Sequence, residues 1–199
     1  MAKIKLTKTE LKAQTDALKR YMRFLPMLQL KKQQLQSEIA GIVAKAEEVA
    51  ARENAVREAL SHWVGLFATD PAAVDGLVKV RKVNTSTANI AGVAIPVFES
   101  VDAEVKPIDK WATPAWLDDA AQVSTKILSL RSEREVFEEQ RRLVQAELQQ
   151  TSQRVNLFEK VKIPECKEAI RVIKIALGDE QTAAVTRGKI AKSRVPEEG

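Results

Sequence analysis

Apolar residues recur at alternating spacings of three and four along the first third of this chain. Their positions are Leu11, Leu18, Tyr21, Leu25, Leu28, Leu35, Ile39, Ile42, Ala46, Val49, Val56, Leu60, Trp63 and Phe67. Gln14, Lys32 and Glu53 interrupt this heptad seam. Over about 60 residues such a seam follows one side of a helix roughly 90 Å long. That length predicts a coiled coil, because helices of globular domains are usually much shorter.

A second seam occupies the C-terminal part of the chain. Its positions are Trp116, Ala120, Val123, Ile127, Leu130, Phe137, Val144, Leu148, Val155 and Phe158, interrupted by Arg134, Arg141 and Thr151. After Pro164 the stripe resumes in a shifted phase, at Cys166, Ile170, Ile173 and Leu177. An interior proline costs a helix roughly 3 kcal/mol, yet each of the two helices contains one, Pro26 and Pro164. We interpret both prolines as sites where the paired helices bend.

Between the seams the apolar residues change to a period of two, which is typical of strands. They are Val78 and Val80, followed by Val93, Ile95 and Val97. A polar segment containing glycine separates the two groups, so the pattern predicts a β-hairpin. Pro96 confines the second strand to a sheet edge or a bulge, because proline cannot donate a ladder hydrogen bond.

The sequence therefore predicts a mostly α protein, a long antiparallel two-helix coiled coil with a small insert that contains a β-hairpin. The N-terminal coiled-coil helix is expected at residues 1–68, the insert at 69–113, and the C-terminal coiled-coil helix with a basic tip at 114–199. If Phe67 lies level with Trp116, Glu53 lies about one turn from Arg134, so the two are expected to form an ion pair. The insert is expected to form a small head at one end of the helix pair.

Charge is distributed unevenly along the chain, although its net value is only +5. Residues 1–32 hold nine Lys and Arg against two Asp and Glu, and residues 154–194 hold ten against five. Residues 33–153 hold thirteen against eighteen, so both ends are basic and the middle is acidic. Basic ends favour nucleic-acid binding as one hypothesis. However, the aromatic residues do not interleave with the basic ones as a stacking surface for bases requires.

No catalytic, cofactor-binding or metal-binding site is expected from the sequence. The segment AAVTRGKI resembles a phosphate-binding loop only faintly, because Ala183 and Ile190 stand where Gly and Ser or Thr are needed. His62 has no partner residues that would make a site, and Cys166 lies on the apolar stripe, where a core role is expected. No apolar run is long enough to cross a bilayer, so direct membrane insertion is not expected.

Three segments in this order resemble the D subunit of the V-type and A-type rotary ATPases. They are TKTELKAQTDALKRYMRFLPMLQLKKQQLQSEI near the N-terminus, NIAGVAIPVFE in the insert, and RVNLFEKVKIPECKEAIRVIKIALGDEQ near the C-terminus. The similarity covers most of the chain. The final GDEQTAAVTRGKIAK departs from the pattern of the family, so contacts of the tip transfer less directly.

The resemblance implies a central-stalk rotor subunit that couples ATP hydrolysis or synthesis to H⁺ or Na⁺ transport and is itself not an enzyme. Its implied partners are the F subunit of the central stalk, the hexameric ring of A and B nucleotide-binding subunits, and the C/d-type subunit that caps the membrane rotor. The implied location is cytoplasmic and peripheral to the membrane, in a bacterium or archaeon. A coiled-coil adaptor unrelated to energy conversion remains the alternative, with a nucleic-acid-binding coiled coil behind it.

Two contact surfaces are expected if the resemblance holds. The tip that faces the ring is assigned to the basic residues at both chain ends, Lys3, Lys5, Lys8, Arg187, Lys189, Lys192 and Arg194. The contact with a neighbouring stalk subunit is assigned to the hairpin, at Asn89, Val93, Ile95, Val97 and Phe98.

Overall fold

The computed structural model describes residues 5–109 and 113–194. In chain order the elements are α1 (Lys8–Ser61), the 3₁₀ helix η1 (Val64–Ala68), α2 (Pro71–Val74), β1 (Val78–Ile90), β2 (Val93–Val105), α3 (Trp116–Leu157), the π-helical turn η2 (Phe158–Lys162) and α4 (Ile163–Arg194). The mostly α fold with a hairpin insert is confirmed. The structure divides into two compact units, residues 33–149 (the head unit) and residues 1–32 with 150–199 (the terminal unit), each considered by itself.

In the head unit, α1 and α3 form an antiparallel pair. Leu35 and Ile42 of α1 share one buried cluster with Val144 of α3, and further along α1 Glu53 contacts Arg134 of α3. Residue numbers rise along α1 as they fall along the facing part of α3, so the expected antiparallel arrangement and the pairing of Glu53 with Arg134 are confirmed. The apolar side chains of the seam are buried because, in a coiled coil, each of them packs between four residues of the facing helix.

The connection after α1 is built around three aromatic rings. Helix α1 ends at Ser61, several residues before the expected boundary, and Phe67 lies on η1. The ring of Phe67 stacks on Trp116 with centroids 5.6 Å apart and meets Trp63 edge-on at the same separation. The expectation that Phe67 lies level with Trp116 is therefore confirmed. However, Phe67 lies on a 3₁₀ helix and not on a continuation of α1.

The insert contains a two-stranded antiparallel sheet whose strands are 13 residues each. Ala91 and Gly92 both have positive φ, 50° and 87°, as the two central residues of a type I′ hairpin turn require. The Gly92 N–H donates to the side-chain oxygen of Asn89 at 2.9 Å and supports the turn. The polar segment before the turn thus belongs to β1, so the strands are longer than the alternation of valines predicted.

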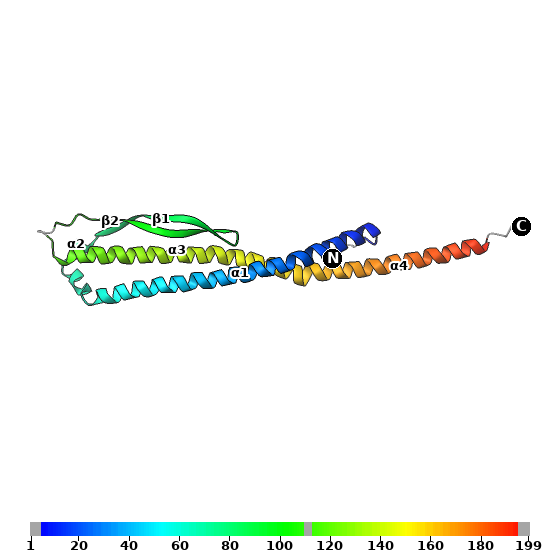
Figure 1. Cartoon of the computed structure of the whole chain (residues 1–199), viewed down its shortest axis with the longest axis horizontal. Helices are drawn as coiled ribbons and strands as arrows, with labels where there is room; N and C mark the ends of the chain where they lie inside the picture. Colours follow the sequence, from blue (N-terminus) through cyan, green and yellow to red (C-terminus); the bar gives the residue numbers. More distant parts are fainter. Residues whose placement is uncertain (1–4, 110–112, 195–199) are drawn as a thin grey trace. The chain divides into compact units, whose positions relative to one another are not determined.

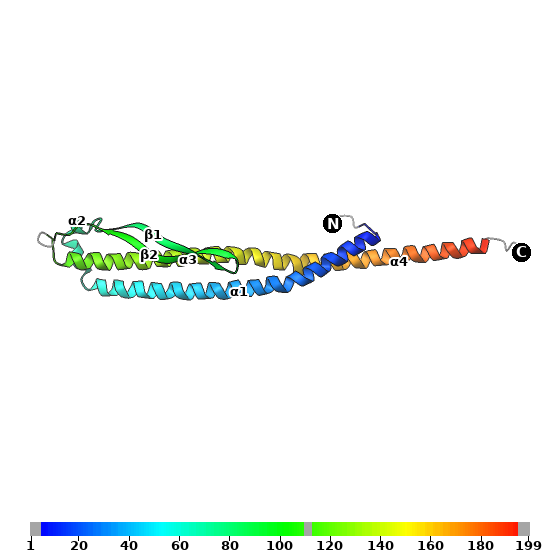
Figure 2. The same cartoon turned by 45° about the horizontal axis from the view of Figure 1, so that its top comes forward.

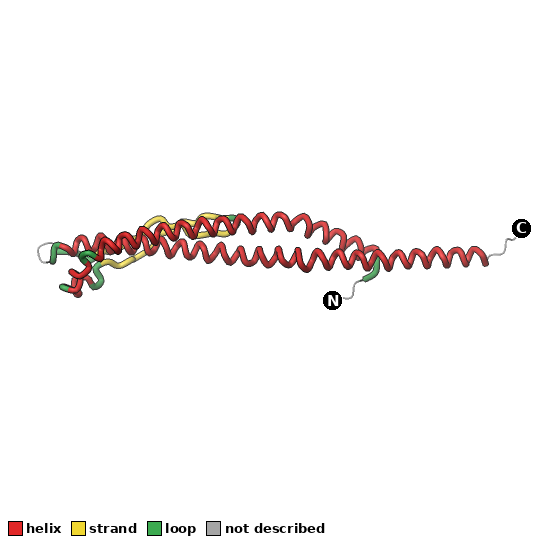
Figure 3. Tube along the Cα trace, turned by 90° about the horizontal axis from the view of Figure 1, so that it is seen from below, coloured by secondary structure: helices red, strands yellow, loops and turns green. Residues whose placement is uncertain are grey.

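The hairpin folds back onto the helices, and this corrects the expectation that the insert forms a small head at one end of the helix pair. Figures 1 and 2 show β1 and β2 lying along α3, and Figure 3 shows the strands beside the helices from below. Ile95 is 3% exposed and joins the core cluster of Leu35 and Val144. The buried side chain of Gln140 donates from Nε2 to the carbonyl of Pro96 at 2.6 Å. Apolar burial and this hydrogen bond fix the hairpin to α3.

In the terminal unit, the first part of α1 lies beside the end of α3, η2 and α4. Tyr21 packs on Phe158 with ring centroids 4.9 Å apart. The Thr7 hydroxyl accepts from the N–H of Glu10 at 3.2 Å, which is half of a capping box at the start of α1. Figure 1 shows α4 continuing beyond the start of α1, and residues 178–193 are exposed. Across the described ranges, no helix has the length and apolarity that crossing a bilayer demands.

The two prolines are accommodated differently. Pro26 lies inside α1, which continues through it as α-helix. Pro164 follows η2, where the N–H of Ile163 donates to the carbonyl of Phe158 five residues back. The wider turn gives the proline ring room beside the carbonyl four residues before it, the usual site of its clash. It also adds a residue to the helix, which explains the predicted phase shift of the apolar stripe after Pro164.

Candidate interaction surfaces

The basic tip residues lie on the last part of α4, where no other helix of the described terminal unit packs against it. Arg187, Lys189 and Lys192 lie beyond Gly178, where the described side chains of α4 are exposed. No Asp or Glu occurs between Gln181 and Lys192. Val185 and Ile190, 58% and 47% exposed, add apolar surface between the cations. This part of α4 therefore presents a mixed basic and apolar surface, suited to an acidic or carbonyl-lined partner.

The structure does not bring the N-terminal lysines to the same place. Lys5 and Lys8 are exposed at the start of α1. Starting from the contact of Tyr21 with Phe158, a rise of 1.5 Å per residue puts Lys8 roughly 20 Å short of Arg187 along the helices. Lys3 lies outside the described residues, and Arg194 is described only as the last residue of α4. The expected tip thus consists of two basic groups at successive levels of the terminal unit.

A group of large apolar side chains around Pro26 and η2 is exposed, and the sequence reasoning missed it. We call it the apolar belt: Met22, Phe24, Met27, Leu30, Leu157 and Val161. On α1 these residues are 47–66% exposed. At 100° per residue the four positions on α1 spread over about 200°, on the side opposite Tyr21 and the seam. Apolar residues at non-seam positions were the signal that could have revealed the belt.

The basic residues beside the belt form a second feature of the same helix. Between Asp16 and Glu38, α1 carries only positive formal charges. These are Lys19, Arg20, Arg23, Lys31 and Lys32. Exposed apolar side chains of this size mark interaction sites, and the cations favour an acidic partner. A surface that spans about 200° of a helix is wider than the stripe that packs against one partner helix.

The hairpin residues assigned to a stalk partner divide between the two faces of the sheet. Ile95 is buried and Val93 packs against the same core, so both face the helices of this chain. Val97 is half-buried and shares their side of β2, because side chains alternate along a strand. Phe98 is half-buried on the other face, and Asn89 is exposed on that face near the turn. Only the outer face, with Asn89 and Phe98, is available to a partner.

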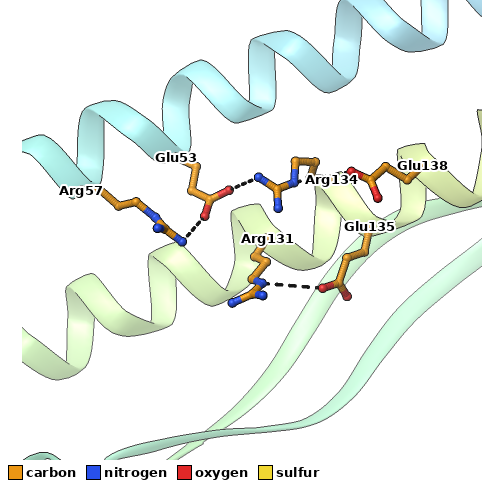
Figure 4. Close-up of polar contacts among 6 residues, drawn as sticks. All are labelled: Glu53, Arg57, Arg131, Arg134, Glu135 and Glu138. Carbon is orange, nitrogen blue, oxygen red and sulfur yellow. Dashed lines mark hydrogen bonds and ion pairs between the residues drawn. The ribbon is translucent and has the colours of Figure 1, made fainter.

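A cluster of charged residues lies in the seam between α1 and α3 in the head unit (Figure 4). Glu53 is 2% exposed, and its two carboxylate oxygens contact different helices. Arg57 of α1 donates to Oε1 at 2.6 Å, and Arg134 of α3 donates to Oε2 at 3.0 Å. Arg134 also lies 3.8 Å from Glu138. The sequence predicted the pair with Arg134 but missed Arg57, although the i,i+4 spacing on one helix contains that signal.

The candidate reactive residues do not form a site. Cys166 is 5% exposed in the terminal unit, as expected for a core residue. Burial, and to a lesser degree the charge of Glu165, raises the pKa of its thiol and so disfavours the reactive thiolate. Among the residues that the structure describes, no group of three His, Cys, Asp or Glu side chains is placed to hold a metal ion. The described surfaces are suited to binding other proteins.

Comparison with known proteins agrees with the family that the sequence pattern resembles. The model of a family described as the D subunit of ATP synthase matches residues 10–193. The V-type ATP synthase D subunit of Borreliella burgdorferi is 45% identical over 193 residues, covering 97% of this chain and 95% of that protein. The V-type ATP synthase D subunit of Chlamydia caviae is 32% identical over 197 residues, covering 98% and 94%. Both relatives are bacterial proteins. The chain belongs to the ATP synthase D-subunit family.

Proposed function

We propose that this chain is the central-stalk rotor subunit of a bacterial V-type ATP synthase. Membership in the D-subunit family makes it a non-catalytic stalk subunit of the rotary complex. In this role the chain transmits torque between the nucleotide-binding subunits and the ion-translocating rotor. It would work in the cytoplasm, attached to the membrane only through the other subunits. The transported ion is H⁺ or Na⁺.

The observation that carries this proposal is the apolar belt of the terminal unit. A shaft inside a ring must offer apolar contact on its outer side, away from the seam that holds its own two helices together. Met22, Met27 and Leu30 lie on that outer side and are 55–66% exposed. A coiled-coil adaptor that binds one partner helix would need only a narrow stripe. The spread of the belt around α1 favours an enclosing ring.

The partners are assigned to separate surfaces. We assign the ring of A and B subunits to the apolar belt and to the basic end of α4, where Arg187, Lys189 and Lys192 would meet acidic or carbonyl groups of its inner wall. We assign the neighbouring F subunit of the stalk to the outer face of the hairpin around Asn89 and Phe98. The C/d-type cap of the membrane rotor would bind the head unit at its aromatic end. Each assignment places a partner where exposed side chains are left uncovered within the described residues.

The test of the complex is affinity purification of the tagged chain from membranes, followed by native mass spectrometry. We expect one copy of the chain with a hexameric ring and the F subunit. Recovery of the chain with none of the nucleotide-binding subunits would contradict the proposal and favour the adaptor. Complexes that disappear after nuclease treatment would favour nucleic-acid binding.

The ring assignment is tested by Met27→Gln combined with Leu30→Gln. Both side chains are exposed in the isolated chain, so folding should be unaffected. Because burying apolar surface contributes roughly 25 cal/mol per Å², we expect at least about a tenfold loss of affinity for the purified ring. The control is Leu66→Gln, which changes a side chain 40% exposed in the head unit. Equal affinity of the double variant and the control would remove the belt from the ring contact.

A further inference from the structure

In the terminal unit the series of backbone hydrogen bonds is interrupted on both helices near the contact of Tyr21 with Phe158. Residue 26 is a proline and cannot donate to the carbonyl of Met22, and residue 164 is a proline and cannot donate to the carbonyl of Lys160. In η2 the N–H of Ile163 donates five residues back, to Phe158. Because the helices are antiparallel and each proline follows its aromatic residue in the chain, the two interruptions lie on opposite sides of the Tyr21–Phe158 contact.

Side-chain packing is also sparse at this level. Between Val155 and Cys166, both buried, no side chain is fully buried. On the facing helix no residue of α1 before Leu35 is fully buried among those described. Elsewhere in the terminal unit Cys166, Ala169 and Ile173 form a regular buried series on α4. The segment with altered backbone bonding is therefore also less buried than the next part of α4, from Cys166 to Ile173, and both properties lower the cost of local distortion.

The extra residue of η2 is needed to keep the apolar stripe of this helix facing α1. If the alternating heptad spacing of three and four continued after Val155, the next seam positions would be 158, 162 and 165. The buried residue is Cys166, one position later. The helix therefore needs one additional residue in this interval to keep both parts of its stripe against α1, and the π-turn supplies it. Pro164 prevents a normal ladder bond at its own position, so the wide turn stays before it.

We propose that η2 and Pro164, together with Pro26 on the other side of the Tyr21–Phe158 contact, form a compliant joint. At this joint α4 bends and twists against the end of α3 under load. This rests on the proposed function only for the origin of the load, the torque on a rotor. The joint consists of backbone groups with fewer helical hydrogen bonds, enclosed by few buried side chains. The ring contact of Tyr21 with Phe158 lies between the two interruptions and holds the helices together while they move.

The joint is removed by deleting Glu159 and replacing Pro164→Ala in one variant. The deletion restores the continuous spacing of three and four from Val155 to the present Cys166, and the alanine restores a ladder donor. The control is Glu159→Ala with Pro164 retained, which changes the same exposed position but keeps the chain length and the π-turn. Hydrogen exchange is followed by mass spectrometry on the full-length chain.

In the natural chain we expect amides of residues 158–168 to exchange about tenfold faster than those of residues 169–177. The difference should disappear in the deletion variant and persist in the control. Equal exchange of the two segments in the natural chain would overturn the joint. Unchanged fast exchange in the deletion variant would also overturn it, because the cause would then be neither the proline nor the π-turn.

A mechanical measurement separates failure of the joint from failure of the proposed function. In the assembled complex, held between ATP turnovers, a bead on the exposed part of the chain fluctuates about its resting angle. We expect the variance of this angle to fall about twofold in the deletion variant, because a continuous helix is stiffer. A bead that turns with ATP but fluctuates equally in both proteins would refute the joint alone. A bead that never turns with ATP would refute the rotor function instead.

Discussion

The charged cluster at Glu53 allows the helix register to be tested energetically. We consider Glu53→Gln, Arg134→Gln and the double variant. In the folded chain Glu53 is 2% exposed and Arg134 donates to it at 3.0 Å, so Arg134→Gln leaves one oxygen of a buried carboxylate without its cation. Leaving a buried polar group unsatisfied costs about 1–3 kcal/mol, and a charged group costs more. Because the Arg134 side chain is 35% exposed, water replaces part of the loss.

We therefore expect Arg134→Gln to lower the free energy of unfolding by about 2 kcal/mol, with a coupling energy of about 1 kcal/mol in the double-mutant cycle. The assay is urea unfolding followed by circular dichroism at one protein concentration for all variants. In the natural chain Arg57 donates to the other oxygen of Glu53 at 2.6 Å, and Arg134→Gln leaves this partner in place, so Arg57 limits the loss. The cycle isolates the interaction between the two helices from the interaction within α1.

The matched control is the pair of Glu139 with Arg142, which lies on one helix. Arg142 donates to Glu139 at 2.6 Å, as short as the contact of Arg57 with Glu53, but both side chains are exposed. Its cycle should show no coupling beyond the scatter of the measurement, because exposed pairs are screened. A coupling of Glu53 with Arg134 no larger than that of the control would refute the register or the importance of burial.

Three further predictions concern the hairpin, the cysteine and an exposed ion pair. Gln140→Ala removes the donor to the Pro96 carbonyl and should raise hydrogen exchange in β2 about fivefold; unchanged exchange would contradict the anchoring. Burial raises the pKa of the Cys166 thiol, so a thiol reagent at pH 8 should react about a hundredfold faster after unfolding, and equal rates would contradict its burial. The hydrogen bond from Arg171 lowers the pKa of Glu168, so its stabilisation is present above the ordinary carboxyl pKa and is lost as the pH falls through the lowered value. Carboxyl NMR should show the Glu168 pKa rise in Arg171→Gln, and no rise would contradict the pair.

The antiparallel coiled coil could be predicted because its information is local and periodic. The spacing of apolar residues defines one face of each helix, and a short insert leaves the helices no alternative to folding back. The contacts of Phe67 with Trp116 and of Glu53 with Arg134 follow from that single choice of register. Even the phase shift after Pro164 was visible, because the stripe restarts one residue late.

The position of the hairpin could not be predicted from the same pattern. Alternation indicates strands, but it does not indicate which surface of the protein buries Ile95. That surface is formed by Gln140 and Val144, which are about 45 and 50 residues further along the chain. In the sequence pattern Gln140 is an ordinary polar residue and Val144 an ordinary seam residue, so neither indicates contact with the hairpin. The π-turn was missed for a related reason, since a proline inside a helix indicates a kink or a break and does not specify which carbonyl each N–H reaches.

The apolar belt could not be predicted from the heptad seam, because the seam contains only the residues that face the partner helix. Met22, Met27 and Leu30 fall between seam positions, and single exposed apolar residues are common on protein surfaces. Their number within three turns of one helix, together with the absence of acidic residues there, is the property that separates a binding surface from chance exposure.

The claim that this chain turns inside a ring of nucleotide-binding subunits is tested most directly by observing its rotation. A bead is attached through Glu48→Cys, an exposed position of α1 in the head unit and outside the assigned partner surfaces, to the complex immobilised by its ring; the buried Cys166 is protected from labelling. With ATP we expect continuous rotation in one direction that stops when ATP is removed. A bead that stays fixed relative to the ring while the same complexes hydrolyse ATP would contradict the account.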